Sequence, residues 1–79
     1  MSSIKMMPLA LLDKCIGEQL WVIMKNKREF AGKLLGFDDF LNMVLEEVTE
    51  IWYEGEERKS NKIEELLLNG HDIAYVNLK

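Results

Sequence analysis

The sequence has little of several residue types, with one cysteine, one proline and one histidine among its 79 residues. A single thiol, Cys15, excludes an intrachain disulfide and a cysteine-based metal site, and it favours a reducing, intracellular compartment. No apolar run approaches the roughly 18 residues of a membrane-spanning helix, so we expect no membrane contact. The segment before Pro8 is too short to be a signal peptide.

Positive charge is also scarce. The chain carries 10 Lys and Arg against 14 Asp and Glu, which gives a formal net charge of −4. Because nucleic-acid affinity comes mostly from cations, this balance argues against a basic arm that wraps nucleic acid. A local RNA site is still compatible with it.

Apolar residues, in contrast, make up 48% of the sequence, which excludes a disordered chain. We expect one domain over residues 1–79, because a chain of this length cannot divide its core between two units. Domains this small bury only about 60% of their unfolded surface, and those without disulfides or metals often gain stability by association. The apolar excess therefore suggests a surface for partners, with a compact monomer as the alternative.

Local patterns predict a short helix followed by five strands. Pro8 suits the first position of a helix over about residues 8–16, and Gly17 suits its C-terminal cap. Apolar runs predict strands at about residues 19–25, 28–37, 41–54, 61–68 and 71–78. The charge-rich residues 54–61 mix both signs around a glycine and are predicted to form a solvated loop.

Two features predict strong curvature. Gly32 and Gly36 lie inside the second strand, where glycine is tolerated at a bend or a close approach. The apolar phase of the third strand slips by one residue between Leu45 and Val48, which is the mark of a β-bulge. Together they favour a small, highly curved antiparallel barrel, as in SH3-like and OB folds.

An Asn-Gly pair, Asn69 and Gly70, lies between the last two predicted strands. In that setting Asn-Gly is the strongest short-range hairpin signal, because a type I′ turn needs positive φ at both central residues. We therefore expect these two strands to form a β-hairpin.

The sequence gives no support to catalysis. Asp38 and Asp39 are adjacent, so in a strand their side chains point to opposite faces and do not form an acid–base pair. His71 and Cys15 have no neighbours at the spacing of a catalytic triad or a metal site. No phosphate-binding loop is present. We expect no enzyme activity, no metal and no cofactor.

Two motifs resemble the Sm and like-Sm (LSm) family. The family's first motif has a glycine in the second strand, then an aspartate, then an aromatic or polar residue two positions before an asparagine, and then an apolar run. The corresponding residues here are Gly32, Asp38, Phe40 and Asn42, followed by residues 43–45. The second motif is residues 67–73. Both occur in the family's order and spacing, and the resemblance covers about residues 8–78.

This resemblance implies the Sm fold, which is mostly β, with a short N-terminal helix followed by a strongly bent five-stranded antiparallel SH3-like barrel. Members of the family form hexameric or heptameric rings, in which the fourth strand of one subunit pairs with the fifth strand of the next. RNA, commonly uridine, binds in the central pore with one nucleotide per subunit. We therefore expect other LSm subunits of a heteroheptameric ring as partners. Exposed strand edges could also let the chain associate with itself in isolation.

The resemblance also implies RNA targets and a location. Such rings bind the oligouridylate 3′ end of U6 small nuclear RNA in pre-mRNA splicing, and a related cytoplasmic ring takes part in messenger RNA decapping and decay. We therefore expect uridine-rich RNA as the ligand, and both the nucleus and the cytoplasm as locations. A subunit of a different Sm-type ring is the alternative.

Three residues of the first motif are candidates for RNA binding. The family position of Phe40 favours stacking on one base, and the alternative is a hydrophobic residue of the turn packed into the core. Asn42 offers a donor and an acceptor that match the O4 and N3–H edge of uracil, and the alternative is a side chain bonded to local backbone. Asp38 would then hold the amide of Asn42 in the correct orientation.

Asn69 and Gly70 are the candidates from the second motif. Many members of the family have arginine at the position of Asn69, where a cation can pack against the base and approach phosphate. Asn69 cannot supply that charge, so we expect Phe40 and Asn42 to carry more of the affinity. A purely structural ring subunit that does not touch RNA is therefore the second hypothesis.

Overall fold

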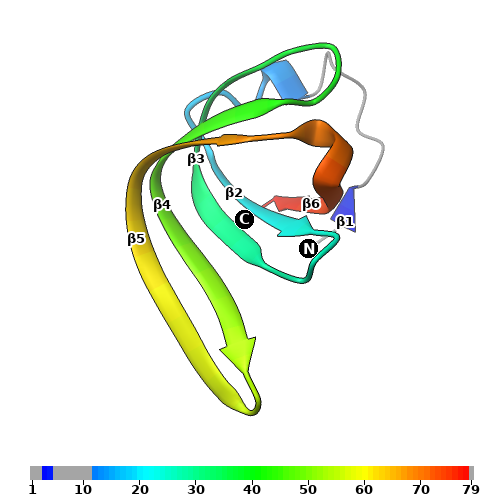
Figure 1. Cartoon of the computed structure of the whole chain (residues 1–79). Coiled ribbons are helices and arrows are strands. Elements are labelled where there is room, and N and C mark those ends of the chain that lie inside the picture. The colour runs from blue at the N-terminus through cyan, green and yellow to red at the C-terminus, as the bar shows by residue number, and fades with distance from the viewer. Residues whose placement is uncertain (1–2, 5–11, 79) are drawn as a thin grey trace.

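The computed structural model describes residues 3–4 and 12–78, which form an antiparallel β-sheet with one short 3-10 turn (Figure 1). The strands are β1 (Ser3–Ile4), β2 (Gln19–Met24), β3 (Glu29–Phe37), β4 (Met43–Glu54), β5 (Glu57–Leu68) and β6 (Ile73–Leu78). The 3-10 turn η1 (Gly70–Asp72) connects β5 to β6. Within the described part of the chain, no helix is long and apolar enough to cross a membrane.

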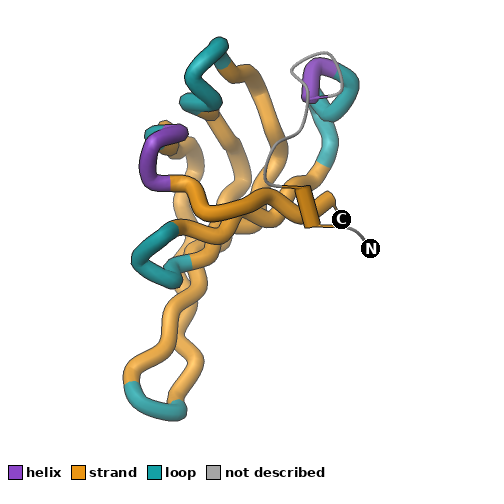
Figure 2. Tube along the Cα trace, turned by 90° about the vertical axis from the view of Figure 1, so that its right-hand side faces the viewer, coloured by secondary structure: helices purple, strands orange, loops and turns teal. Residues whose placement is uncertain are grey.

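The strand order in the sheet is β1-β6-β2-β3-β4-β5, so the sheet ends at β1 on one side and at β5 on the other. Strands β4 and β5 pair along their length and extend as a hairpin beyond the rest of the sheet (Figures 1 and 2). The sheet bends around one apolar core. The most deeply buried side chains are those of Leu12, Leu20, Val22, Leu34, Met43, Leu45 and Val48.

The predicted bend in the long third strand is confirmed at Glu47, where φ is 53°. The register between β3 and β4 shifts twice, and the shift between Ala31 and Lys33 lets both Leu45 and Val48 face the same core. Beside this bend, Gly32 lies so close to β4 that a Cβ atom would come within 3.0 Å of Cγ2 of Val48. The glycine inside β3 therefore allows the close approach of the neighbouring strand.

The five expected strands are present, but two architectural details differ. Strands β5 and β1 do not pair with each other among the described residues, so the bent sheet is open rather than a closed barrel. The helix expected over about residues 8–16 lies partly outside the described residues and is not confirmed. Inside them, Leu12 and Asp13 are helical and residues 14–17 form a turn.

The solvated loop expected over residues 54–61 is wrong. Strand β5 begins at Glu57, which pairs with Glu54 of β4, and only residues 55–56 form the turn. Gly55 has a φ of 66°, which suits glycine at this sharp reversal. Most side chains here are exposed on both faces of the hairpin, so the sequence lacks the apolar alternation that marks a strand. Strands β4 and β6 begin slightly later than expected, at Met43 and Ile73.

The hairpin expected at Asn69 and Gly70 is also wrong. Strand β5 pairs with β4, whereas β6 pairs with β2, so the last two long strands lie at different places in the sheet. Asn69 has an extended backbone with φ −82° and ψ 120°, and its side chain accepts a hydrogen bond from the backbone N–H of His71. Asn69 therefore caps the 3-10 turn instead of occupying a type I′ turn.

Candidate nucleic-acid interface

The turn between β3 and β4, residues 38–42, is built around the carboxylate of Asp38. Its Oδ1 accepts hydrogen bonds from the backbone N–H groups of Phe40 at 2.8 Å and of Asn42 at 3.0 Å. Its Oδ2 accepts a further hydrogen bond from Nδ2 of Asn42 at 2.9 Å. Leu41 has a φ of 64°, so the chain reverses tightly between the two residues that Asp38 binds. The carboxylate can only accept, so the nitrogen of the Asn42 amide must face Asp38.

These contacts also affect the ionisation of Asp38. The hydrogen bond from the Asn42 side chain is the largest cause that holds the pKa of this carboxyl below its ordinary value, and the backbone N–H groups of Phe40 and Asn42 add to it. Partial loss of hydration raises the pKa, but the hydrogen bonds outweigh it and the net pKa is lowered. Hydrogen bonds donated to a carboxylate favour its charged form. Asp38 therefore stays an acceptor at neutral pH.

The other end of the Asn42 amide connects this turn to η1. Oδ1 of Asn42 accepts a hydrogen bond from the backbone N–H of Gly70 at 2.8 Å. A Cβ atom on Gly70 would clash with the carbonyl oxygen of Phe40 and with the backbone of Leu41. Gly70 is thus required for close approach rather than for a positive φ. With Nδ2 and Oδ1 each holding one protein partner, Asn42 keeps one N–H and one lone pair for a ligand.

Phe40 lies at the tip of the same turn, and its side chain is 81% exposed. This exposure overturns the alternative in which Phe40 is a core residue. An exposed aromatic ring beside an amide of fixed orientation offers a flat stacking surface and an adjacent hydrogen-bonding edge. The structure therefore brings together Asp38, Phe40, Asn42 and Gly70 in one place.

Asn69 directly precedes Gly70 in the chain, but its side chain bonds to η1 and not to the turn at residues 38–42. Its Oδ1 accepts the hydrogen bond from the His71 backbone N–H at 2.9 Å, which stabilises η1. Asn69 carries no charge, so any positive charge at this site must come from another residue.

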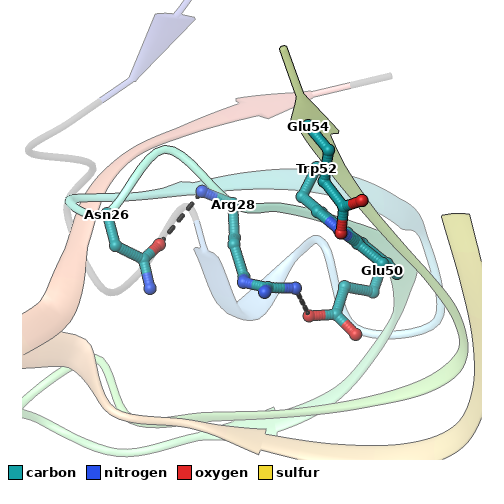
Figure 3. A network of polar contacts seen from close by, with 5 residues as sticks. All are labelled: Asn26, Arg28, Glu50, Trp52 and Glu54. Carbon is teal, nitrogen blue, oxygen red and sulfur yellow. Dashed lines mark hydrogen bonds and ion pairs between the residues drawn. The ribbon is translucent and has the colours of Figure 1, made fainter. Parts of the chain in front are cut away.

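One neighbouring segment was not expected from the sequence. The turn between β2 and β3, residues 25–28, lies against η1, because the backbone N–H of Lys25 donates to the carbonyl of Asp72 at 2.9 Å. On the other side of this turn, the Arg28 guanidinium stacks over the ring of Trp52 (Figure 3). No local spacing connects these residues in the sequence, since only the pairing of β3 with β4 brings them together.

The site offers groups suited to binding. Within residues 3–4 and 12–78, no cluster of three or more His, Cys, Asp or Glu side chains could hold a metal ion. Cys15 is buried in the core, and His71 is exposed on η1. What the arrangement supplies is a ring for stacking and an amide with a defined donor and acceptor.

Known proteins share this architecture. A family model described as the LSM domain matches residues 10–78. The LSM complex subunit lsm5 of Schizosaccharomyces pombe is 55% identical over 72 residues, which cover 91% of this chain and 88% of the relative. The probable U6 snRNA-associated Sm-like protein LSm5 of Dictyostelium discoideum is 46% identical over 70 residues, which cover 89% of this chain and 72% of the relative.

The solved structures agree with the sequence comparison. The crystal structure of the SmAP1 heptamer of P. aerophilum matches with a TM-score of 0.78 at 27% identity, and the match covers 89% of each chain. The open, bent sheet of five long strands is therefore the Sm fold that the two motifs predicted.

Proposed function

The chain belongs to the LSM domain family, and from that membership we propose that it is an RNA-binding subunit of a heteroheptameric LSm ring. In this proposal the subunit holds one nucleotide of uridine-rich RNA in the pore of the ring. The base stacks on Phe40, and the uracil edge pairs with Asn42. We propose no catalytic role for it.

The observation that carries the proposal is the fixed orientation of the Asn42 amide beside an exposed Phe40. Asp38 and Gly70 hold Nδ2 and Oδ1 in known positions. The remaining N–H can donate to O4 of uracil, and the remaining lone pair can accept its N3–H. Cytosine presents the reverse pattern, a donor at N4 and an acceptor at N3, so for a base held in one orientation on Phe40 this amide favours uracil.

Ring assembly is supported by the edges of the sheet. Strand β5 has no partner on its outer side among the described strands, and it carries Leu67, an apolar residue that is 69% exposed. An unpaired edge of this kind is a template for another strand. We propose that β5 of this subunit pairs with the strand equivalent to β6 in its neighbour. On β6 itself, β1 covers Val76 and Asn77, so pairing along the whole of β6 requires β1 to leave.

The finer assignment concerns the RNA and the compartment. We propose that the ring binds the oligouridylate 3′ end of U6 small nuclear RNA in the nucleus. A related cytoplasmic ring that contains this subunit would act in messenger RNA decapping and decay. The name of the Dictyostelium relative, which associates that protein with U6 snRNA, supports the nuclear part of the proposal.

A structural subunit that does not touch RNA is the second candidate, and the uncharged Asn69 is the observation that favours it. Photocrosslinking separates the two functions. A reconstituted ring is irradiated with an oligouridylate that carries a photoreactive uridine, and the crosslinked peptides are identified. We expect crosslinks to residues 38–42 of this subunit. If the ring binds the RNA and crosslinks form only on other subunits, the structural function is the correct one.

A further inference from the structure

A second group of aromatic and basic side chains lies on the far side of η1 from Phe40. The Arg28 guanidinium carbon lies 4.8 Å from the centre of the Trp52 ring. Nη1 of the same arginine donates to Oε2 of Glu50 at 2.6 Å, and its backbone N–H donates to Oδ1 of Asn26 at 3.0 Å (Figure 3). The arginine is therefore fixed at three points and holds the β2–β3 turn against the outer part of β4.

These contacts form one wall of a hollow. The hollow has a volume of about 350 Å³ and is lined by Asn26, Lys27, Arg28, Trp52 and Tyr53. This volume lies near the lower end of the roughly 300–1,000 Å³ that is usual for small-ligand pockets. The lining includes two basic and two aromatic residues but no acidic residue, although the whole chain carries a net charge of −4. Of the two basic residues, Arg28 is paired with Glu50 and Lys27 makes no ion pair within the described residues.

Lys27 and Arg58 are the cations near the hollow that can meet an anion. The carboxylate of Glu50 is held by Arg28, and Glu54 accepts a hydrogen bond from Nε1 of Trp52 at 3.2 Å. Lys27 and Arg58 make no ion pair within the described part of the chain. Arg58 lies directly opposite Tyr53 in the β4–β5 register. Two unengaged cations thus flank a tyrosine that is 57% exposed.

The turn that carries part of the hollow is linked to the candidate site at Phe40 through η1. The Lys25 backbone N–H holds the β2–β3 turn against η1, and the Gly70 N–H holds η1 against Asn42. In both views η1 lies between the residue 38–42 turn above it and the β2–β3 turn below it (Figures 1 and 2). An RNA strand that runs from the turn at residues 38–42 past η1 along this side of the subunit therefore reaches the hollow.

We propose that this hollow is a second nucleotide-binding site, which takes single-stranded RNA that continues beyond the nucleotide held at Phe40. A base stacks on the exposed Tyr53 ring, and Lys27 and Arg58 lie against the phosphates. The Arg28–Trp52 pair keeps the wall in place. Stacking on an aromatic ring beside cations is the usual chemistry of sequence-tolerant binding to single strands. This inference rests on the proposed RNA-binding function.

The test compares two RNAs on the reconstituted ring. One is a short oligouridylate of about six nucleotides, and the other carries the same uridines with unpaired adenylate extensions at both ends. The Tyr53→Ala variant should lower the affinity for the extended RNA by about five-fold or more, since stacking on an aromatic ring carries much of such binding. It should leave the affinity for the short RNA unchanged. Tyr53→Phe keeps the ring and should keep the affinity for the extended RNA.

The charge is tested separately. Lys27 has a φ of 74°, and asparagine tolerates this conformation, so Lys27→Asn removes the charge with little strain. It should reduce the slope of log affinity against log salt for the extended RNA by the amount of about one phosphate contact. Lys14→Asn is the matched control, because Lys14 is an exposed lysine in the turn before β2.

The outcomes separate this inference from the proposed function. If the wild-type ring binds neither RNA, the proposed function fails. If the wild-type ring binds both RNAs, and the Tyr53→Ala and Lys27→Asn variants each bind the extended RNA as tightly as the wild type does, the proposal of a second site is wrong. If an acidic peptide of equal charge displaces the extended RNA from this site as well as free oligoadenylate does, the hollow is a general anion site and the inference is also wrong.

Discussion

The side-chain oxygen Oδ1 of Asn42 accepts a hydrogen bond at 2.8 Å from the backbone N–H of Gly70, 28 residues further along the chain. This single contact joins the first sequence motif to the second. It also fixes the orientation of the amide from the side opposite Asp38. The proposed nucleotide site is therefore formed by two segments, and Asn42, the residue proposed to read the base, holds them in register.

Gly70→Ala should disrupt this junction. The added methyl group would overlap the carbonyl oxygen of Phe40 and the backbone of Leu41, and backbone atoms cannot yield as a flexible side chain can. We expect a loss of about 1–3 kcal/mol in the free energy of unfolding, measured by denaturant titration. Gly36→Ala is the matched control, because a Cβ atom on Gly36 would meet nothing within 4 Å. Equal stability of the two variants would contradict the close approach at Gly70.

Asn42→Ala should raise the pKa of Asp38. The side chain of Asn42 is the largest cause that keeps this pKa below its ordinary value. Carboxyl-carbon NMR titration of the wild type and the variant measures the change. Asn69→Ala is the control, since Asn69 binds the backbone of His71 and not Asp38. An unchanged Asp38 pKa in Asn42→Ala would show that the turn is held together differently.

The depressed pKa of Asp38 also predicts how acid affects stability. Its contribution to the free energy of unfolding is complete above about 3.9, the pKa of aspartate in an unfolded chain. It is lost as the pH falls through the lower pKa of the folded state, because the folded carboxylate must then take up a proton. Asp38→Asn should flatten this part of the stability profile, as measured by denaturant titration across the acidic range. A profile as steep as that of the wild type would assign the acid sensitivity to other carboxylates.

Asn69→Arg should strengthen RNA binding. The substitution adds a cation beside the proposed nucleotide site and removes the side-chain oxygen that caps η1. We expect a steeper salt dependence, by about 0.7 in the slope of log affinity against log salt for one added phosphate contact on a single strand. We also expect a loss of about 0.5–1.5 kcal/mol in stability from the missing hydrogen bond. Asn69→Ala should show the stability loss without the change in slope.

Leu67→Lys should prevent ring assembly and leave the fold intact. Leu67 is 69% exposed in the single chain, so its replacement removes little from the core. On β5, whose outer edge no described strand pairs with, a lysine discourages pairing with another strand. Native mass spectrometry with the partner subunits should show the variant outside the ring, with an unchanged circular dichroism spectrum. Ile16→Lys changes an exposed residue before β2 and should still enter the ring.

Parts of this structure could be predicted from the sequence because their signals are local. The slip in apolar phase between Leu45 and Val48 predicted the bend that the structure has at Glu47. The short spacing from Asp38 to Asn42 likewise contained the whole hydrogen-bonded turn. In both cases the residues that interact are near neighbours in the chain.

The sequence-based predictions failed where pairing between strands distant in the chain overrides the local preference of the residues. Asn-Gly signals a hairpin, but β6 pairs with β2. Asn69 instead caps η1, and Gly70 allows η1 to lie close to the backbone of Phe40 and Leu41. The exposed hairpin around Gly55 has charged residues on both faces, so periodicity could not reveal its strands. The Arg28–Trp52 pair depends on the β3–β4 register, which no motif encodes.

The most direct test of the proposed nucleotide site is the affinity of the reconstituted ring for oligouridylate when Phe40 is changed. Phe40 is 81% exposed, so Phe40→Ala removes a stacking surface without a cost to the core. Stacking on an aromatic ring contributes about 1–3 kcal/mol per base. We predict that Phe40→Ala weakens oligouridylate binding several-fold or more, while Phe40→Tyr retains it and both rings stay intact. Binding by an intact Phe40→Ala ring as tight as that of the wild type would contradict a stacking site at Phe40.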